Sequence, residues 1–160
     1  MGSFDGQPVR VLAGQDRFAR QRKVFGVMPF AIKLTAQDVG EGWLILEQAN
    51  AYRGGPPRHL HHGQDEWFYV IEGEYVVEIA GQPYRLGPGD SILAPREVPH
   101  TWALVGQGAG RMLIAFQPAG KMEAFFDEAT KLSQMPPYQE VRELFATHGM
   151  EVVGPPLEVD

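Results

Sequence analysis

Residues 54–73, Gly-Gly-Pro-Pro-Arg-His-Leu-His-His-Gly-Gln-Asp-Glu-Trp-Phe-Tyr-Val-Ile-Glu-Gly, carry the strongest signal in the sequence, because they place three candidate metal ligands within eight positions. These ligands are His59, His61 and Glu66. Side chains alternate between faces along an extended chain, so the two histidines can reach the same ion. A short turn then separates His61 from Glu66, which opens the next strand. The spacing predicts a metal site built on a strand, a turn and a second strand.

A fourth candidate ligand, His100, lies at the head of a later strand, after the turn, strand and turn of residues 87–99. Imidazole and carboxylate groups bind divalent iron, manganese, nickel, cobalt, copper or zinc. We therefore expect one such ion, held by His59, His61, Glu66 and His100. His62 points to the opposite face in this register, although a slip of one residue would exchange it for its neighbour. The alternative, a surface histidine cluster without a role, fits the alternating spacing less well.

At these residues the chain resembles the cupin superfamily. The two family motifs are matched at seven positions: His59, His61, Glu66, Gly73, Gly89, Pro95 and His100. Two positions depart from the pattern, since Glu97 stands where the family prefers glycine and Leu104 where it prefers asparagine. The resemblance implies an all-β, double-stranded β-helix (jelly-roll) barrel with the ion inside it, and dimers formed through the sheets.

The rest of the chain predicts a compatible organisation, because many short strands with close turn signals are followed by helical patterns. We expect a single cupin domain over residues 1–160, with a barrel core over about 25–118 and C-terminal α-helices over about 119–149. The helices should pack on the outside of the barrel, and the tail from residue 151 should be loosely held. The expected strands are 9–12, 25–34, 43–48, 66–71 paired as a hairpin with 74–80, 84–86, 91–94, 100–105 and 111–116.

Alternation from the ligands also predicts an apolar pocket beside the ion. The residues that share a face with the ligands, and so form this expected substrate pocket, are Phe68, Val70, Trp102, Leu104, Met112, Ile114 and Phe116. Trp67 and Tyr69 fall on the opposite face. Adjacent large aromatic side chains usually become covered, so we expect a second subunit or a terminal segment to cover them.

Composition excludes several functional classes. The formal net charge of -6 over 160 residues and the lack of a Lys/Arg run argue against a nucleic-acid partner. The basic residues between 17 and 23 are expected to form a solvated face. The sequence has no cysteine, which excludes disulfides and thiolate ligands. The sequence begins without a signal-like segment, and no apolar run reaches membrane length, so we expect a cytoplasmic protein without a membrane partner.

The organisation of the whole chain resembles the single-domain relatives of quercetin dioxygenases. That resemblance implies oxygen-dependent cleavage of a flavonol-type ring, with Glu66 as the catalytic base and the metal holding a substrate oxygen. The expected partners are a flat apolar small molecule, dioxygen and a second copy of the chain. Two alternatives remain open. One is a non-redox isomerase or lyase that acts on a small keto or sugar substrate, and the other is a non-catalytic small-molecule-binding cupin.

Overall fold

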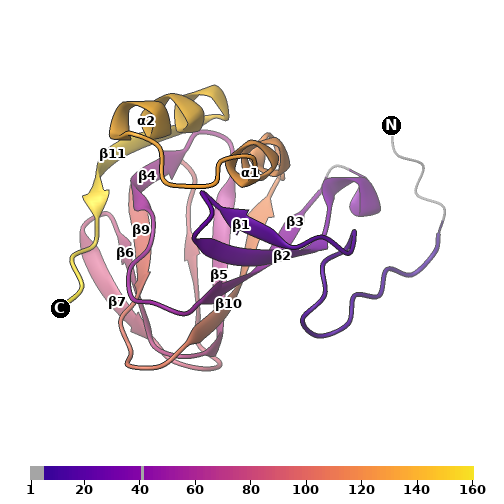
Figure 1. The fold of residues 1–160 in the computed structure, drawn as a ribbon, viewed down its shortest axis with the longest axis horizontal. Coiled ribbons are helices and arrows are strands. Elements are labelled where there is room, and N and C mark those ends of the chain that lie inside the picture. Colours follow the sequence, from indigo (N-terminus) through magenta and orange to yellow (C-terminus); the bar gives the residue numbers. More distant parts are fainter. Residues whose placement is uncertain (1–5, 41) are drawn as a thin grey trace.

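The computed structural model describes residues 6–40 and 42–160, and the strands among them form two antiparallel sheets (Figure 1). The first sheet has the order β1 (Arg22–Val24), β2 (Met28–Leu34), β3 (Leu44–Asn50), β10 (Gly110–Gln117), β5 (Asp65–Glu72) and β8 (Ser91–Ala94). The second sheet has the order β11 (Met150–Pro156), β4 (Pro57–His61), β9 (His100–Leu104), β6 (Tyr75–Ile79) and β7 (Gln82–Leu86). The predicted all-β jelly-roll class is therefore confirmed.

Alternating side chains from both sheets fill the space between them. On β5, Phe68 and Val70 are fully buried, whereas the intervening Tyr69 is only half-buried. On β10, Met112 and Ile114 alternate in the same way with half-buried neighbours. This period of two is the pattern expected of strands that bury one face. The inward faces therefore make a continuous apolar core.

Two expected local pairings are wrong. The predicted hairpin of residues 66–80 does not form, because β5 and β6 belong to different sheets. The metal-site strands β4 and β5 are likewise divided between the sheets, so their turn crosses from one sheet to the other. Instead, β5 lies between β10 and β8. The consecutive strands β4, β5 and β6 alternate between the two sheets, which local sequence patterns do not distinguish from a hairpin.

Three other expectations at the ends of the chain are corrected. Residues 9–12 form no strand, and the expected strand 25–34 is a hairpin of β1 and β2 with its turn at residues 25–27. The tail is not loosely held, because β11 pairs with β4. Without β11, strand β4 would be a sheet edge with unpaired backbone groups. The tail therefore completes the second sheet.

The predicted helices form, but their position differs from the expectation. Helices α1 (Met122–Thr130) and α2 (Tyr138–Thr147) lie across one open end of the barrel and not on its outside (Figure 1). A short 3-10 helix also covers Ala36–Val39. We call α1, α2 and the loop between them the cap. The cap buries its apolar stripes at this end: Met122, Phe125, Phe126, Ala129, Val141 and Phe145.

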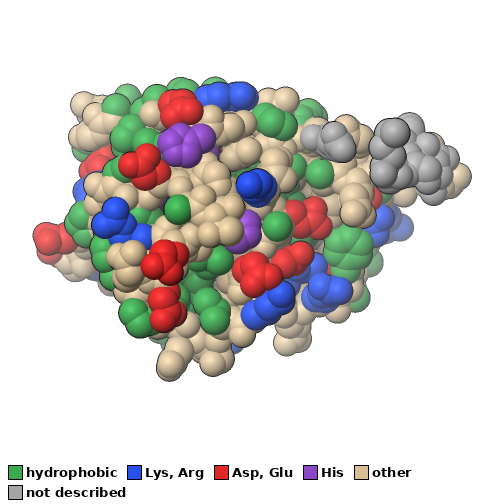
Figure 2. Space-filling model, turned by 90° about the horizontal axis from the view of Figure 1, so that it is seen from above, with side chains coloured by type: hydrophobic (Ala, Val, Ile, Leu, Met, Phe, Trp, Pro, Cys, Tyr) green, Lys and Arg blue, Asp and Glu red, His purple; other side chains and the backbone are tan. Residues whose placement is uncertain are grey.

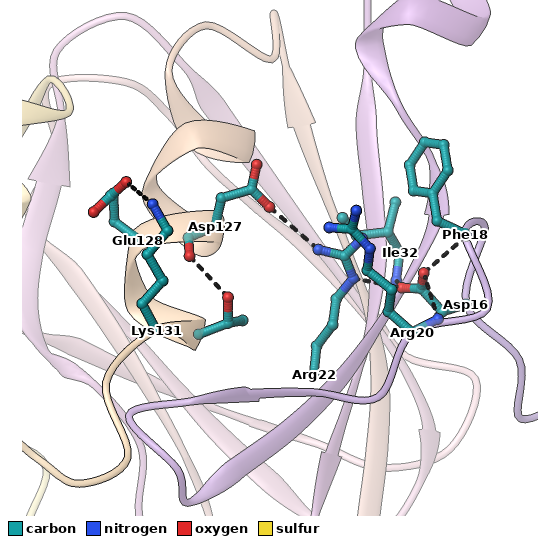
Figure 3. A network of polar contacts seen from close by, with 9 residues as sticks. Asp16, Phe18, Arg20, Arg22, Ile32, Asp127, Glu128 and Lys131 are labelled. Carbon is teal, nitrogen blue, oxygen red and sulfur yellow. Dashed lines mark hydrogen bonds and ion pairs between the residues drawn. The ribbon is translucent and has the colours of Figure 1, made fainter.

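A buried ion-pair network ties the cap to the N-terminal segment (Figure 3). The Arg22 guanidinium donates to Asp16 at 2.8 Å and to Asp127 of α1 at 3.2 Å. Asp16 also accepts hydrogen bonds from the backbone of Phe18 and Ile32. Burial opposes ionisation of Asp16, but these hydrogen bonds outweigh it and lower the pKa of its carboxyl. Arg22 is therefore a structural connection between two segments far apart in sequence.

The expectation of a solvated basic face over residues 17–23 is accordingly wrong for two of its members. Arg22 is 6% exposed, and Arg17 forms a two-point ion pair with Asp38. Arg20 and Lys23 are exposed, as expected. The sequence pattern did not separate these pairs, because their acidic partners lie elsewhere in the chain.

The outward aromatic residues of β5 occupy the predicted face. Trp67 is 37% exposed and stacks on Tyr69, with ring centroids 5.7 Å apart. Their covering by a second subunit stays a prediction. None of the helices in the described ranges combines the length and the hydropathy that crossing a membrane requires.

Candidate metal centre

The four predicted ligands converge at the capped end of the barrel. His59 and His61 come from β4 and His100 from the neighbouring strand β9, with His59 directly opposite His100. Glu66 comes from β5 in the facing sheet. All four are buried, and one ligand atom from each lies within 4.8 Å of the others. Three imidazoles from one sheet and one carboxylate from the other thus surround a common point.

The distances within the cluster fit a metal ion. One oxygen of Glu66, Oε2, lies 2.8 Å from His61 Nε2 and 2.7 Å from His100 Nε2. With metal–ligand distances of about 2.1 Å, neighbouring ligand atoms at right angles lie roughly 3 Å apart. The observed spacings approach that value. The donor set of nitrogen and oxygen suits a divalent transition metal, and small shifts would admit the ion.

Backbone carbonyls orient two of the histidines. Nδ1–H of His59 donates to the carbonyl of Pro57 at 2.7 Å, and Nδ1–H of His100 donates to that of Val98 at 3.2 Å. In His59 this leaves Nε2 with a free lone pair for a metal, whereas Nε2 of His100 contacts Oε2 of Glu66 at 2.7 Å. His61 differs, because its buried Nδ1 has no hydrogen-bond partner in the described part of the chain. The ring of His61 is instead held by packing against Phe116, at 5.5 Å between centroids.

Electrostatics keep His59 and Glu66 in the protonation states that bind a cation. Burial, assisted by the neighbouring histidines, lowers the pKa of His59 to about 3, so this imidazole is neutral. Burial also opposes the ionisation of Glu66, but interactions with His100 and His61 outweigh it and hold the pKa of this carboxyl below its usual range. Burial would lower the pKa of His100, yet the Glu66 carboxylate raises it. A neutral imidazole and an ionised carboxylate are the forms that ligate metals.

The turn before His100 shows how the departure at Glu97 is accommodated. Glu97 has φ of +66°, in the left-handed region that favours glycine. Its backbone N–H donates to the carbonyl of His61 at 2.7 Å, and its carboxylate lies 3.0 Å from Nδ1 of His62. His62 is therefore turned outward, as predicted. Contacts with the ligand strand offset the backbone strain at Glu97.

A cavity of about 300 Å³ adjoins the ligand cluster. Of the predicted pocket residues, Trp102, Ile114 and Phe116 lie on its wall. The other four are fully buried in the core and do not line it: Phe68, Val70, Leu104 and Met112. They share the inward face with the ligands, but the two sheets close over them below the cavity.

The cap and the N-terminal hairpin supply most of the remaining wall, and the sequence interpretation missed these residues. They include Val24, Phe25, Met28, Met122, Phe125, Phe126, Met135, Tyr138, Val141 and Phe145. Phe145 packs edge-on against His59, with centroids 5.3 Å apart. The apolar stripes of the two helices were visible as a sequence signal. Their position over the metal cluster was not.

Acidic and basic side chains are interspersed on the face of the molecule that carries the cap (Figure 2). This face shows no broad patch of a single charge.

Comparison with known proteins agrees with this architecture. Residues 49–116 match the family described as "Cupin domain". No curated protein matches the sequence. An RmlC-like cupin from Shewanella frigidimarina is similar in structure, with a TM-score of 0.57 and 19% identity over 73% of this chain and 96% of that one.

Two further solved structures are similar. KdgF from Halomonas sp. has a TM-score of 0.53 and 22% identity, over 62% of this chain and 86% of that chain. A predicted oxalate decarboxylase from Thermotoga maritima has a TM-score of 0.54 and 18% identity, over 57% and 80%. At these identities the likeness shows the fold alone. Residues 49–116 thus match a cupin domain, and the fold of the chain is similar to that of these cupin structures.

Proposed function

We propose that this protein is a metal-dependent dioxygenase that cleaves a flavonol-type or related enediol or aromatic substrate. The observation that carries the proposal is a buried cluster of three histidines and one glutamate that opens directly onto an apolar cavity. A flat apolar molecule with one chelating end matches both parts of this site. The proposed metal is a divalent first-row ion: iron, manganese, nickel, cobalt, copper or zinc.

His59, His61, His100 and Glu66 would hold the ion. When bound, a redox-capable metal supplies Lewis acidity and exchanges electrons with dioxygen. Dioxygen is the oxidant in the proposed reaction, and both of its atoms enter the cleaved product.

Glu66 is the proposed catalytic base. Its carboxylate accepts the proton of an acidic substrate hydroxyl, which leaves the substrate as an electron-rich anion. Phe116 and Phe145, which pack against His61 and His59, exclude water from the side of the cluster that faces the cavity. The apolar wall therefore protects the reactive anion from bulk solvent.

The apolar wall also separates this function from the alternatives. Sugar substrates carry many hydroxyl groups that need polar partners, and the cavity offers few. A non-redox isomerase or lyase on a small keto compound would use the same ligands without consuming dioxygen. A non-catalytic binding protein would retain the substrate unchanged.

The test is aerobic incubation of metal-loaded protein with quercetin, followed by its absorbance, oxygen uptake and product mass. We expect loss of the flavonol absorbance with uptake of dioxygen. Glu66→Gln should retain part of the metal but lower turnover by roughly 100-fold or more, because the base is lost. Glu72→Gln, at an exposed residue of the same strand, is the matched control and should leave turnover unchanged.

Two results would contradict the proposal. If metal-loaded protein leaves flavonols and related enediols untouched under oxygen, the dioxygenase assignment is wrong. If Glu66→Gln turns over at the rate of the unmodified protein, the base role of Glu66 is wrong. Substrate conversion without oxygen uptake would instead favour the non-redox alternative.

A further inference from the structure

One buried amide on the cavity wall has an unused hydrogen-bond acceptor. Gln48 lies on the inward face of β3, lines the cavity and is 3% exposed. Its Nε2 donates to the carbonyls of Pro29 at 3.2 Å and Ala49 at 3.4 Å. These two carbonyls can only accept, so they fix which end of the amide is nitrogen. Among the hydrogen bonds of ranges 6–40 and 42–160, none is accepted by Oε1 of Gln48.

The register of the first sheet places Gln48 far from the ligand cluster. Leu44 of β3 lies opposite Phe116, which lies opposite Glu66. Gln48 is four residues further along β3 and opposite Met112. At about 3.3 Å per residue, this is roughly 13 Å along the strand. Gln48 therefore cannot contact a group held at the metal cluster, and it faces a different part of any ligand.

Few other side chains on the cavity wall can accept a hydrogen bond from a ligand. Apart from the four ligands, most wall side chains are apolar, and Tyr138 is 55% exposed at the mouth. Trp102 is buried on the wall, but its indole nitrogen is a donor and cannot accept. Within the described chain, Gln48 is thus the buried wall side chain outside the ligand cluster that can accept a hydrogen bond. When a ligand fills the cavity and shuts this acceptor off from water, leaving it unpaired costs binding free energy, so a ligand donor would satisfy it.

We propose that Gln48 is a specificity-determining residue that accepts a hydrogen bond from a hydroxyl at the end of the substrate remote from the metal. The inference rests on the proposed function for the class of ligand. It adds that the substrate is elongated, with a chelating group at one end, an apolar body and a single donor at the other. A ligand without this donor leaves Oε1 of Gln48 unpaired when the cavity is filled.

The test compares two ligands that differ by one hydroxyl, 3-hydroxyflavone and 3,4′-dihydroxyflavone, in which the added group is remote from the chelating end. Their dissociation constants are measured by calorimetry with metal-loaded protein without oxygen, so binding is separated from turnover. We expect the unmodified protein to bind the dihydroxy compound about 5-fold to 10-fold more tightly, as one hydrogen bond predicts. Gln48→Met, which fills similar volume without an acceptor, should reduce this ratio to near one.

Two further variants make the result decisive. Gln82→Met makes the same change at an exposed residue of β7 that does not line the cavity, and it should keep the preference of the unmodified protein. Gln48→Asn retains an amide but withdraws its oxygen, so it should also lower the ratio, and it serves if Gln48→Met does not fold. A ratio that is unchanged in the folded Gln48 variants overturns the proposal. Equal binding of the two compounds by the unmodified protein, or no binding of either, also overturns it.

The dioxygenase assignment is judged separately, by turnover of the same protein in air. A binding ratio that depends on Gln48 without any turnover supports this inference and contradicts the dioxygenase. Turnover together with a binding ratio that does not depend on Gln48 supports the dioxygenase and contradicts this inference.

Discussion

The two sides of the cavity differ in origin. One side consists of β4, β5 and β9, which carry the four ligands within residues 57–104. The other side consists of the β1–β2 hairpin and the cap, which come from the two ends of the chain. The ligand side is fixed by direct strand pairing, such as His59 opposite His100. The cap side is held by apolar packing and by the ion pairs of Arg22.

The difference in origin therefore matches a division between the side proposed to carry the chemistry and the side proposed to select the substrate. The ligand side can hold a metal wherever the two sheets are correctly paired, and it contributes few of the side chains that shape the cavity. The cap side carries none of the four candidate ligands, but its Phe and Met side chains form much of the apolar wall. Changes on the ligand side should therefore abolish metal binding, and changes on the cap side should alter stability or substrate preference.

The largest expected effect is on metal binding. His100→Ala removes one of four ligands and should weaken metal affinity roughly 1,000-fold, since a four-ligand zinc site binds with about 10 to 16 kcal/mol. Metal content after dialysis, measured by elemental analysis, and competition with a chelator check this. His62→Ala is the control, because His62 is exposed and points away from the cluster. Equal metal retention by both variants would mean that the ligand side is not the metal centre.

The next effect is on stability. Arg22→Met leaves the buried Asp16 without its cationic partner and should lower the free energy of unfolding by about 3 kcal/mol. Urea unfolding followed by circular dichroism measures it. Arg20→Met, in the same segment but with an exposed side chain, should change stability by less than about 0.5 kcal/mol. A similar small change for Arg22→Met would show that packing alone holds the cap.

The smallest expected effect concerns the mouth of the cavity. Met135 is 54% exposed in the loop between α1 and α2 and lines the cavity. Met135→Ala should change the free energy of unfolding by less than about 0.5 kcal/mol. It should nevertheless raise KM for an apolar substrate a few-fold with kcat retained. The lost contact stabilises the bound substrate and the transition state equally. A fall in kcat with KM unchanged would contradict the division between the two sides.

Much of the architecture was predictable from local patterns. The period of two in residues 66–71 identified β5 and its buried face, and the i, i+3, i+4 pattern from Met122 identified α1. His59 and His61 were identified from their alternating spacing, Glu66 from the turn that follows them, and His100 from its position at the head of a later strand. The outward direction of His62 followed from the same alternation.

Long-range pairing was not predictable from the same patterns. A strand's alternation specifies which face is buried but not which neighbour it meets, so β5 and β6 were mistaken for a hairpin. The same reason explains the tail, whose pairing with β4 depends on an edge formed almost ninety residues earlier. Arg22 was assigned to a solvated face because Asp127 lies 105 positions away.

The sequence by itself determined the ligand types, the strand and helix periods and the apolar faces, because these follow from side-chain chemistry and local backbone geometry. The tertiary structure alone decided that Glu66 meets the histidines from the opposite sheet, that the cap closes the metal end of the barrel, and that Gln48 faces the cavity. Each of these depends on contacts between distant segments. The free energy of these long-range contacts is shared among many weak interactions, so no single stretch of sequence encodes it.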